Sequence, residues 1–159
     1  MYIQKQDYQI RIRINLLDIL LENIATGMGA GETPDDILAA ANKIACDTIA
    51  TKAGVVYKVD EEFTKTGNDR NGYILSLALS IALYEIYQRV DDYEVPEKVI
   101  KNYNDAFESL DDISRGKEPL NLPPRDNGEN ANPGDDENAG TTGTGLRRFG
   151  SAKKRSHRI

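Results

Sequence analysis

Few side chains in this chain of 159 residues could serve as a nucleophile, a base or a metal ligand. The sequence holds one cysteine, Cys46, and one histidine, His157. One thiol cannot close an internal disulfide, and one Cys with one His cannot supply the ligands of a structural zinc site. A nucleophilic Cys needs a base and an electropositive setting, and the sequence around Cys46 offers neither. We therefore interpret Cys46 as a small core residue and predict neither a metal nor a cofactor.

Carboxylates come as adjacent pairs, at residues 35–36, 61–62, 91–92 and 111–112. Two carboxylates can share acid–base work when their surroundings separate their pKa values. Adjacent residues on a helix, however, point about 100° apart, so we interpret these pairs as helix-capping or solvated groups. The glycine-rich residues 140–145 lack the Gly-Lys-Ser/Thr ending and the strand–loop–helix setting of a phosphate loop. With no catalytic constellation in the sequence, we predict that the protein is not an enzyme.

The basic C-terminal tail gives the strongest sign of binding. Residues 147–159 carry six Lys or Arg side chains and no acid, whereas residues 1–146 carry 14 basic against 26 acidic side chains. In one interpretation the tail docks on an acidic partner, with two apolar side chains as anchors. In another it binds nucleic-acid phosphates as an electrostatic anchor, and in a third it only aids solubility. The candidate docking residues are Leu146, Arg147, Arg148, Phe149, Lys153, Lys154, Arg155 and Arg158.

The elements that must position these groups are mostly helical. Residues 9–15 alternate between apolar and polar side chains, which predicts a short β segment with Ile10, Ile12 and Ile14 on one face. Residues 16–25 read as a short helix. Thr33 as N-cap, followed by Pro34 at the first helical position, predicts a helix that continues to residue 53.

Two further helices follow a stretch at residues 55–59 that favours a short strand or extended edge. Residues 71–90 are apolar on most sides, so we expect the most buried helix there. The last helix opens at Pro96, shows apolar residues at steps of three and four, and ends at Gly116. We therefore predict a mainly α fold, a small bundle of about four helices with a short N-terminal β segment and a long extended C-terminal arm.

Composition divides the chain into three parts. Residues 1–116 have the apolar periodicity of a folded helical body. Residues 117–146 are rich in Pro, Gly, Asn and acids, so they cannot bury enough apolar surface to offset their ordering entropy and are predicted to be a linker arm. Residues 147–159 form the basic docking tail. Fully extended, the chain after residue 116 could reach roughly 140 Å, far enough to cross a neighbouring subunit.

Small and aromatic side chains in the body are candidates for subunit packing. The helix over residues 36–53 carries a stripe of Ala residues that permits close approach of another helix. Tyrosines bury their rings while keeping the hydroxyl at a wet rim, and they are common in subunit interfaces. The candidate packing residues are Ala41, Ala45, Tyr84, Tyr87 and Tyr103.

The sequence also indicates a cellular setting. It contains no run of 18 or more apolar residues, so no membrane span is expected. The first residues lack the apolar region of a secretory signal. A single unpaired thiol is compatible with a reducing compartment such as a cytoplasm.

An ordered series of these features resembles the small head–tail connector, or head-completion and adaptor, proteins of Mu-like phages and prophages. The series comprises the short helix at residues 16–25, the Ala-rich helix at 36–53 and the Tyr/Arg segment at 83–89. Residues 148–151, Arg-Phe-Gly-Ser, are similar to the family's short C-terminal tail. The most recognisable spacing lies in the last helix and just beyond it, at Val99, Tyr103, Ala106, Leu110, Ile113, Gly116 and Leu120.

The resemblance implies a structural virion protein at the neck of a tailed phage. Members of this family form a ring, commonly twelve-fold, beneath the portal, extend the DNA channel and provide the platform for tail attachment. The expected partners are then other copies of the chain, the portal protein, other neck or tail proteins, and genomic DNA that passes without sequence-specific binding. The nucleic-acid-binding interpretation of the basic tail remains the alternative.

Overall fold

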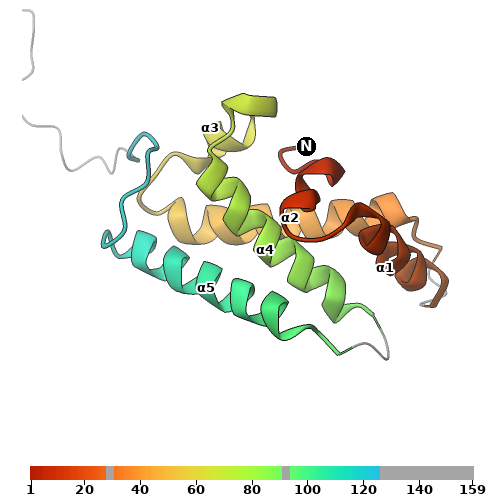
Figure 1. Cartoon of the computed structure of the whole chain (residues 1–159). Helices are drawn as coiled ribbons and strands as arrows, with labels where there is room; N and C mark the ends of the chain where they lie inside the picture. The colour runs from red at the N-terminus through yellow and green to blue at the C-terminus, as the bar shows by residue number, and fades with distance from the viewer. Residues whose placement is uncertain (28–30, 91–93, 126–159) are drawn as a thin grey trace, which may run out of the picture. The chain divides into compact units, whose positions relative to one another are not determined.

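In the computed structural model the chain folds into a helical bundle, with residues 1–27, 31–90 and 94–125 described. Met1–Asp126 forms one compact unit. The elements run η1 (Lys5–Ile10), α1 (Ile14–Gly27), α2 (Pro34–Ala53), α3 (Val59–Phe63), η2 (Gly67–Asp69), α4 (Gly72–Gln88) and α5 (Glu97–Ser114) (Figure 1). This confirms the prediction of a mainly α-helical bundle.

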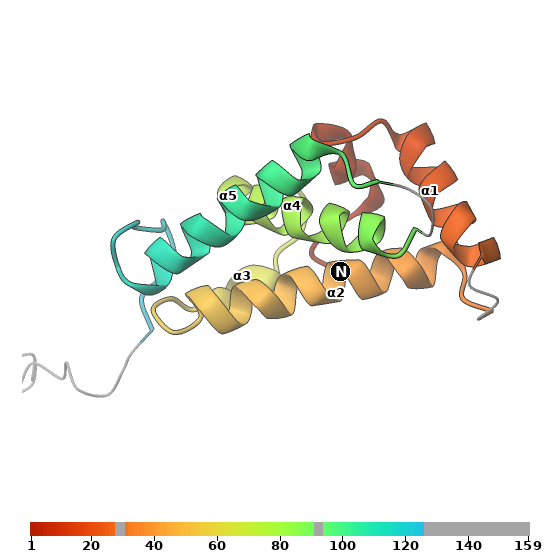
Figure 2. The same cartoon turned by 90° about the horizontal axis from the view of Figure 1, so that it is seen from below.

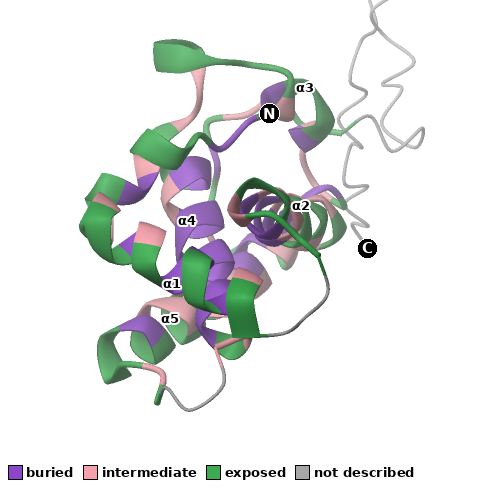
Figure 3. Ribbon diagram, turned by 90° about the vertical axis from the view of Figure 1, so that its right-hand side faces the viewer, coloured by how far each residue is buried: buried purple, intermediate pink, exposed green. Residues whose placement is uncertain are grey.

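Helix α4 is the centre of the core. Its sequence is apolar on nearly every side, and the helix is accordingly buried along most of its length (Figure 3). Helices α2 and α5 both pack against α4 and against each other, while α1 packs across one end of α2 (Figure 2). Asn71 caps α4 by accepting hydrogen bonds from the backbone N–H groups of Tyr73 and Ile74.

Helix α2 begins where the sequence predicts. The Thr33 hydroxyl accepts a hydrogen bond from the Asp36 N–H at 3.2 Å, and the Asp36 carboxylate accepts one from the Thr33 N–H at 3.0 Å. This capping box satisfies two backbone donors, and Pro34 supplies the fixed φ of a first helical residue. The helix ends at Ala53, as predicted from Gly54.

The predicted N-terminal β segment at residues 9–15 is wrong. The 3₁₀ helix η1 covers residues up to Ile10, and α1 already begins at Ile14. Of the three isoleucines assigned to one face, Ile10 is 65% exposed while Ile12 and Ile14 are only partly buried. Alternation of polar and apolar side chains over seven residues does not by itself make a strand, because a strand needs a neighbouring strand to complete its backbone hydrogen bonds.

Residues 55–59 also differ from the expected strand. After Ala53 the chain makes a turn, with the Tyr57 N–H bonded to the Ala53 carbonyl, and it enters α3 at Val59. Among the described residues the β-type pairing is confined to one isolated antiparallel bridge between Tyr57 and Pro124.

The segment 117–125 returns to the helices after α5 ends. Gly116 adopts a φ of 71°, the left-handed conformation that suits glycine at a helix C-terminus. Leu120 is buried, and its N–H donates to the Tyr57 hydroxyl at 3.1 Å. Backbone bonds from Lys58 to Pro123 (2.9 Å) and from Arg125 to Val56 (2.7 Å) then fix this segment beside the α2–α3 turn. The remainder of the predicted arm, and the basic tail at 147–159, lie outside the described residues.

Candidate interaction surfaces

The small side chains proposed for subunit packing lie inside the body. Ala41 is 2% exposed and Ala45 is fully buried, and both belong to the main core cluster. Their small size therefore serves the packing of α2 against the other helices of the same chain, of which α4 is the main neighbour. This corrects their assignment to a subunit interface, because a residue without exposed surface cannot contact another copy of the folded body.

Two of the three candidate tyrosines stack on each other. The rings of Tyr84 in α4 and Tyr103 in α5 lie 3.9 Å apart between centroids with an interplanar angle of 23°. Tyr103 also contacts Phe107, one turn further along α5, at 4.6 Å. Tyr87 is 7% exposed. These aromatic side chains join α4 to α5, and part of the Tyr84, Tyr103 and Phe107 surface remains accessible.

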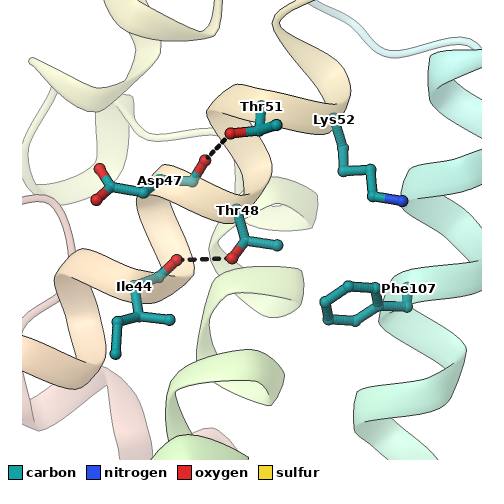
Figure 4. A pocket seen from close by; sticks show the side chains of 6 residues that line it. All are labelled: Ile44, Asp47, Thr48, Thr51, Lys52 and Phe107. Carbon is teal, nitrogen blue, oxygen red and sulfur yellow. Dashed lines mark hydrogen bonds between the residues drawn. The ribbon is translucent and has the colours of Figure 1, made fainter.

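A shallow apolar groove lies between α2 and α5, beside this aromatic row (Figure 4). It encloses about 380 Å³. Thr48 and Thr51 direct their hydroxyls to carbonyls of their own helix, each at 2.8 Å. Those hydroxyls are satisfied within the chain, so the groove presents mainly apolar surface. We call this the α2–α5 groove; its lining is Ile44, Asp47, Thr48, Thr51, Lys52 and Phe107.

Opposite charges flank the α2–α5 groove along α2. Asp47 forms an exposed ion pair with Lys43, and Lys52, one turn past Thr48, pairs with Asp111 of α5 at 2.5 Å. The hydrogen bond from Lys52 lowers the pKa of the Asp111 carboxyl. Exposed ion pairs of this kind contribute little net stability, so a partner that offers its own charges can replace them at small cost.

A second exposed feature is a stripe on the outer face of α1. Its buried face carries Leu17, Leu20, Leu21 and Ile24. At the edge of this face Leu16 is 45% exposed, and Ile19, further round the helix, is 51% exposed. Arg13 precedes them by one turn and Glu22 follows by one turn; both are exposed, and neither forms an ion pair within the described residues. We call the exposed apolar pair Leu16 and Ile19 the α1 ridge.

A second hollow, of about 400 Å³, adjoins the ridge and is bordered by α1, α4 and α5. Its floor includes Leu83, Tyr87 and Val99, and three cations border it: Arg11, Arg13 and Lys98. The Arg11 Nη2 atom donates to the Ser76 hydroxyl at 2.6 Å, while its Nε is buried without a hydrogen-bond partner. No acidic side chain is among the described residues that line this hollow.

The environment of Cys46 does not activate its thiol. Burial, together with the neighbouring Asp47 carboxylate, raises the pKa of this half-buried side chain to about 11. The thiol is therefore protonated at neutral pH, which is the weakly nucleophilic form. Within residues 1–27, 31–90 and 94–125, no cluster of His, Cys, Asp and Glu side chains is arranged to hold a metal ion.

The exposed apolar residues of the α1 ridge and the α2–α5 groove are absent from the sequence-based list of interface candidates. A signal for the ridge exists in the sequence: Leu16 and Ile19 are spaced three apart and fall outside the stripe formed by Leu17, Leu20 and Ile24. A helix with one buried face has no need of such a second apolar stripe. The groove has no comparable signal, because Phe107 comes from a different helix.

Part of the chain is similar in sequence to a known protein family. Residues 70–138 match the model of the family described as Bacteriophage Mu, Gp36. The match supports a Mu-like phage protein. The matched stretch includes α4, α5 and the segment that returns to Tyr57, and the family suggests a structural protein associated with the virion. No curated protein and no solved structure matches the chain significantly. In the part of the chain that the structure describes, none of the helices is long and apolar enough to cross a membrane.

Proposed function

We propose that this Mu-like phage protein forms a ring at the head–tail interface, between portal and tail, and acts there as an adaptor that extends the DNA channel. The observation that carries the proposal is the presence of two unlike exposed apolar surfaces on one folded body, the α1 ridge and the α2–α5 groove. The match of residues 70–138 to a Mu phage family supports the setting.

Two unlike surfaces favour a ring for a geometric reason. A symmetric dimer uses the same patch on both copies, whereas contact between different patches repeats from copy to copy. Such a head-to-tail arrangement closes into a ring when the rotation per copy divides a full turn. Single exposed apolar side chains are ordinary on a protein surface, but a ridge and a hollow of matching polarity are typical of partners.

Charge supports a channel role. Residues 1–146 carry 26 acidic and 14 basic side chains. A net negative wall repels DNA phosphates and lets a duplex slide without adhering. In this proposal the basic residues 147–159 dock on the portal or on a neighbouring subunit, and other neck or tail proteins bind the ring from the opposite side.

The first test is the mass of the purified full-length chain, measured by native mass spectrometry and accompanied by electron-microscope images. The proposal requires a closed oligomer with a central opening, with or without added portal protein. A chain that remains monomeric in both conditions would contradict it.

A second test separates adaptor from nucleic-acid binder. Deletion of residues 146–159 should leave the helical circular-dichroism signal unchanged and abolish attachment to purified portal rings.

Duplex DNA is then titrated against the full chain at increasing salt. Tight binding at low salt that disappears at moderate salt would favour the nucleic-acid alternative, whereas no binding at low salt would remove it.

A further inference from the structure

We propose that the hollow bordered by α1, α4 and α5 is a docking site for an acidic segment of another protein. An aliphatic side chain of that segment enters the hollow, and flanking carboxylates face the cations that border it. We call this site the cationic hollow; its cations are Arg11, Arg13 and Lys98. The inference goes beyond the proposed ring, because it concerns a partner of different sequence and not another copy of the chain.

The charge of the cationic hollow is opposite to that of the surrounding body. Residues 1–146 carry 26 acidic and 14 basic side chains, yet three of the basic ones border this single hollow and no acid is among its described lining residues. Glu97, next to Lys98 in sequence, is exposed and does not line the hollow. A positive patch selects a negative partner, because complementary potentials favour docking and like charges repel.

Two of these cations have no ionic partner in the folded body. Arg13 and Lys98 are exposed, and neither forms an ion pair within the described residues. The α2–α5 groove differs in this respect, because Lys52 is already paired with Asp111. A carboxylate that binds in the cationic hollow therefore forms new ion pairs without first breaking existing ones.

Arg11 is held in position before a partner binds. Its Nη2 atom donates to the Ser76 hydroxyl at 2.6 Å and to the Ser76 carbonyl at 3.3 Å. Its Nε atom is buried without an acceptor, so the guanidinium keeps an unused donor. A guanidinium presents a planar fork that matches the two oxygens of a carboxylate, and a side chain that is already fixed loses little entropy on binding.

The interior of the cationic hollow is apolar. Leu83, Tyr87 and Val99 form its floor, and Leu16 of the α1 ridge also lines it. Its volume of about 400 Å³ lies within the range of about 300–1,000 Å³ that is typical of ligand pockets. An aliphatic side chain that enters the hollow gains from the burial of apolar area. A nucleic-acid backbone offers phosphates but no such side chain, so the apolar interior favours a peptide over DNA.

A short labelled peptide tests the site by fluorescence anisotropy. The probe is Asp-Glu-Leu-Glu-Asp with a fluorophore at its N-terminus; one comparison peptide has Ser in place of Leu, and another has amides in place of the acids. The protein is the full-length chain with its six basic tail residues changed to Gln, which prevents the tail from binding the probe. We call this the tail-neutral chain; the changed residues are Arg147, Arg148, Lys153, Lys154, Arg155 and Arg158.

Binding should require both the charges and the aliphatic side chain. Arg13→Glu and Lys98→Glu should each weaken binding of the probe about fivefold, the size expected for loss of one exposed ion pair. The matched control Arg115→Glu, an exposed reversal outside the hollow, should leave the affinity unchanged. The Ser peptide should bind at least about fivefold more weakly than the probe. Equal affinities of the three reversal variants for the probe would overturn the proposal. Circular-dichroism melting checks that each variant is folded.

Disulfide trapping locates the bound peptide. The tail-neutral chain with Cys46→Ala receives either Pro96→Cys, in the lining of the hollow, or Val55→Cys, at an exposed position outside it. A peptide with Cys in place of Leu is then equilibrated with each chain in glutathione buffer. The Pro96→Cys chain should give at least about fivefold more mixed disulfide than the Val55→Cys chain. Equal yields would show that the peptide binds elsewhere and would overturn the assignment.

Two other occupants give distinct results, and either result would overturn the proposal. Duplex DNA that binds the tail-neutral chain and loses affinity in Arg13→Glu would identify a phosphate site. An oligomer of the unaltered chain that dissociates in Arg13→Glu and in Lys98→Glu would identify a second copy as the occupant.

The outcomes also separate this inference from the proposed ring. A closed oligomer that does not bind the probe would leave the ring intact and remove the docking site. A chain that binds the probe in the cationic hollow but stays monomeric, with and without portal protein, would support the docking site and contradict the ring.

Discussion

Arg70 and Asp7 form a two-point ion pair that ties the N-terminal segment to the loop before α4. The Nη1–Oδ2 distance is 2.5 Å and the Nη2–Oδ1 distance is 2.9 Å, and both side chains are largely buried. Arg70 also donates to the backbone carbonyl of Tyr2 at 2.7 Å. One guanidinium thus holds η1 and the chain before it against the bundle, across 63 positions of sequence.

Breaking this pair from one side should destabilise the body strongly. Arg70→Met leaves the Asp7 carboxylate buried without its partner, at an expected cost of about 3 kcal/mol in the free energy of unfolding. Urea denaturation followed by circular dichroism measures it. Asp7→Asn/Arg70→Met, which removes both charges, should recover part of the loss. A single-variant cost below about 1 kcal/mol, the level of an exposed ion pair, would show that the pair is solvated.

Acid should destabilise the body through two carboxylates. Burial alone would raise the pKa of Glu62, but hydrogen bonds from the Asn71 N–H, Lys65 and Tyr2 outweigh it, so that the pKa lies below its usual value. Burial would also raise the pKa of the Asp7 carboxyl. Hydrogen bonds from Arg70 and from the Gln4 N–H outweigh burial, so the pKa of Asp7 lies below its usual value.

A lowered pKa in the folded state fixes the sign of the pH effect. The stabilisation is fully present above the unfolded-state pKa of about 4 and is lost as pH falls through the lower folded-state pKa values. Unfolding free energies measured between about pH 5 and pH 2 should therefore decline toward acid, with a shallower slope in Glu62→Gln and Asp7→Asn. An unchanged slope in both variants would refute the assignment.

The stacked pair Tyr84–Tyr103 should stabilise the junction of α4 and α5. A double-mutant cycle with Tyr84→Ala and Tyr103→Ala is expected to give a coupling energy of about 1 kcal/mol, the usual range for aromatic pairs. Tyr84→Phe and Tyr103→Phe keep the rings and should cost much less. A coupling energy near zero would show that the contact between the two rings does not stabilise the fold.

The contribution of the capping box at the N-terminus of α2 to stability can be measured by replacing Thr33. Thr33→Ala removes the side-chain acceptor for the Asp36 N–H and should cost about 1 kcal/mol, whereas Thr33→Ser keeps it and should be nearly neutral. Thermal unfolding of the full chain measures both. Equal melting temperatures for the Ala and Ser variants would contradict the role of the hydroxyl.

Local signals in the sequence predict most of the helices. Thr33 with Pro34 marks the start of α2, and the steps of three and four in residues 99–113 mark α5, because both features depend only on neighbouring positions. Residues 9–15 fail the same treatment. Within this stretch Arg11 donates a hydrogen bond to the Ser76 hydroxyl of α4, a contact between distant positions that local patterning cannot reveal.

The interaction surfaces were predictable only in part. Exposed Leu16 and Ile19 can be found once the buried face of α1 is drawn, since they fall outside the positions that form that face. Ala45, by contrast, has the residue type of a packing surface but is fully buried within its own chain. Residue type indicates that close packing occurs; only the tertiary arrangement identifies the partner.

The pairing of residues 123–125 with the α2–α3 turn has a mechanical consequence. Two backbone hydrogen bonds, Lys58 to Pro123 and Arg125 to Val56, hold this segment, and the Arg125 guanidinium adds a bond to the Gly54 carbonyl. A pulling force applied beyond residue 125 would reach this clip before it reached the helices. The clip can peel one bond at a time under tension, so the bundle would be shielded from a sudden load until the segment had detached.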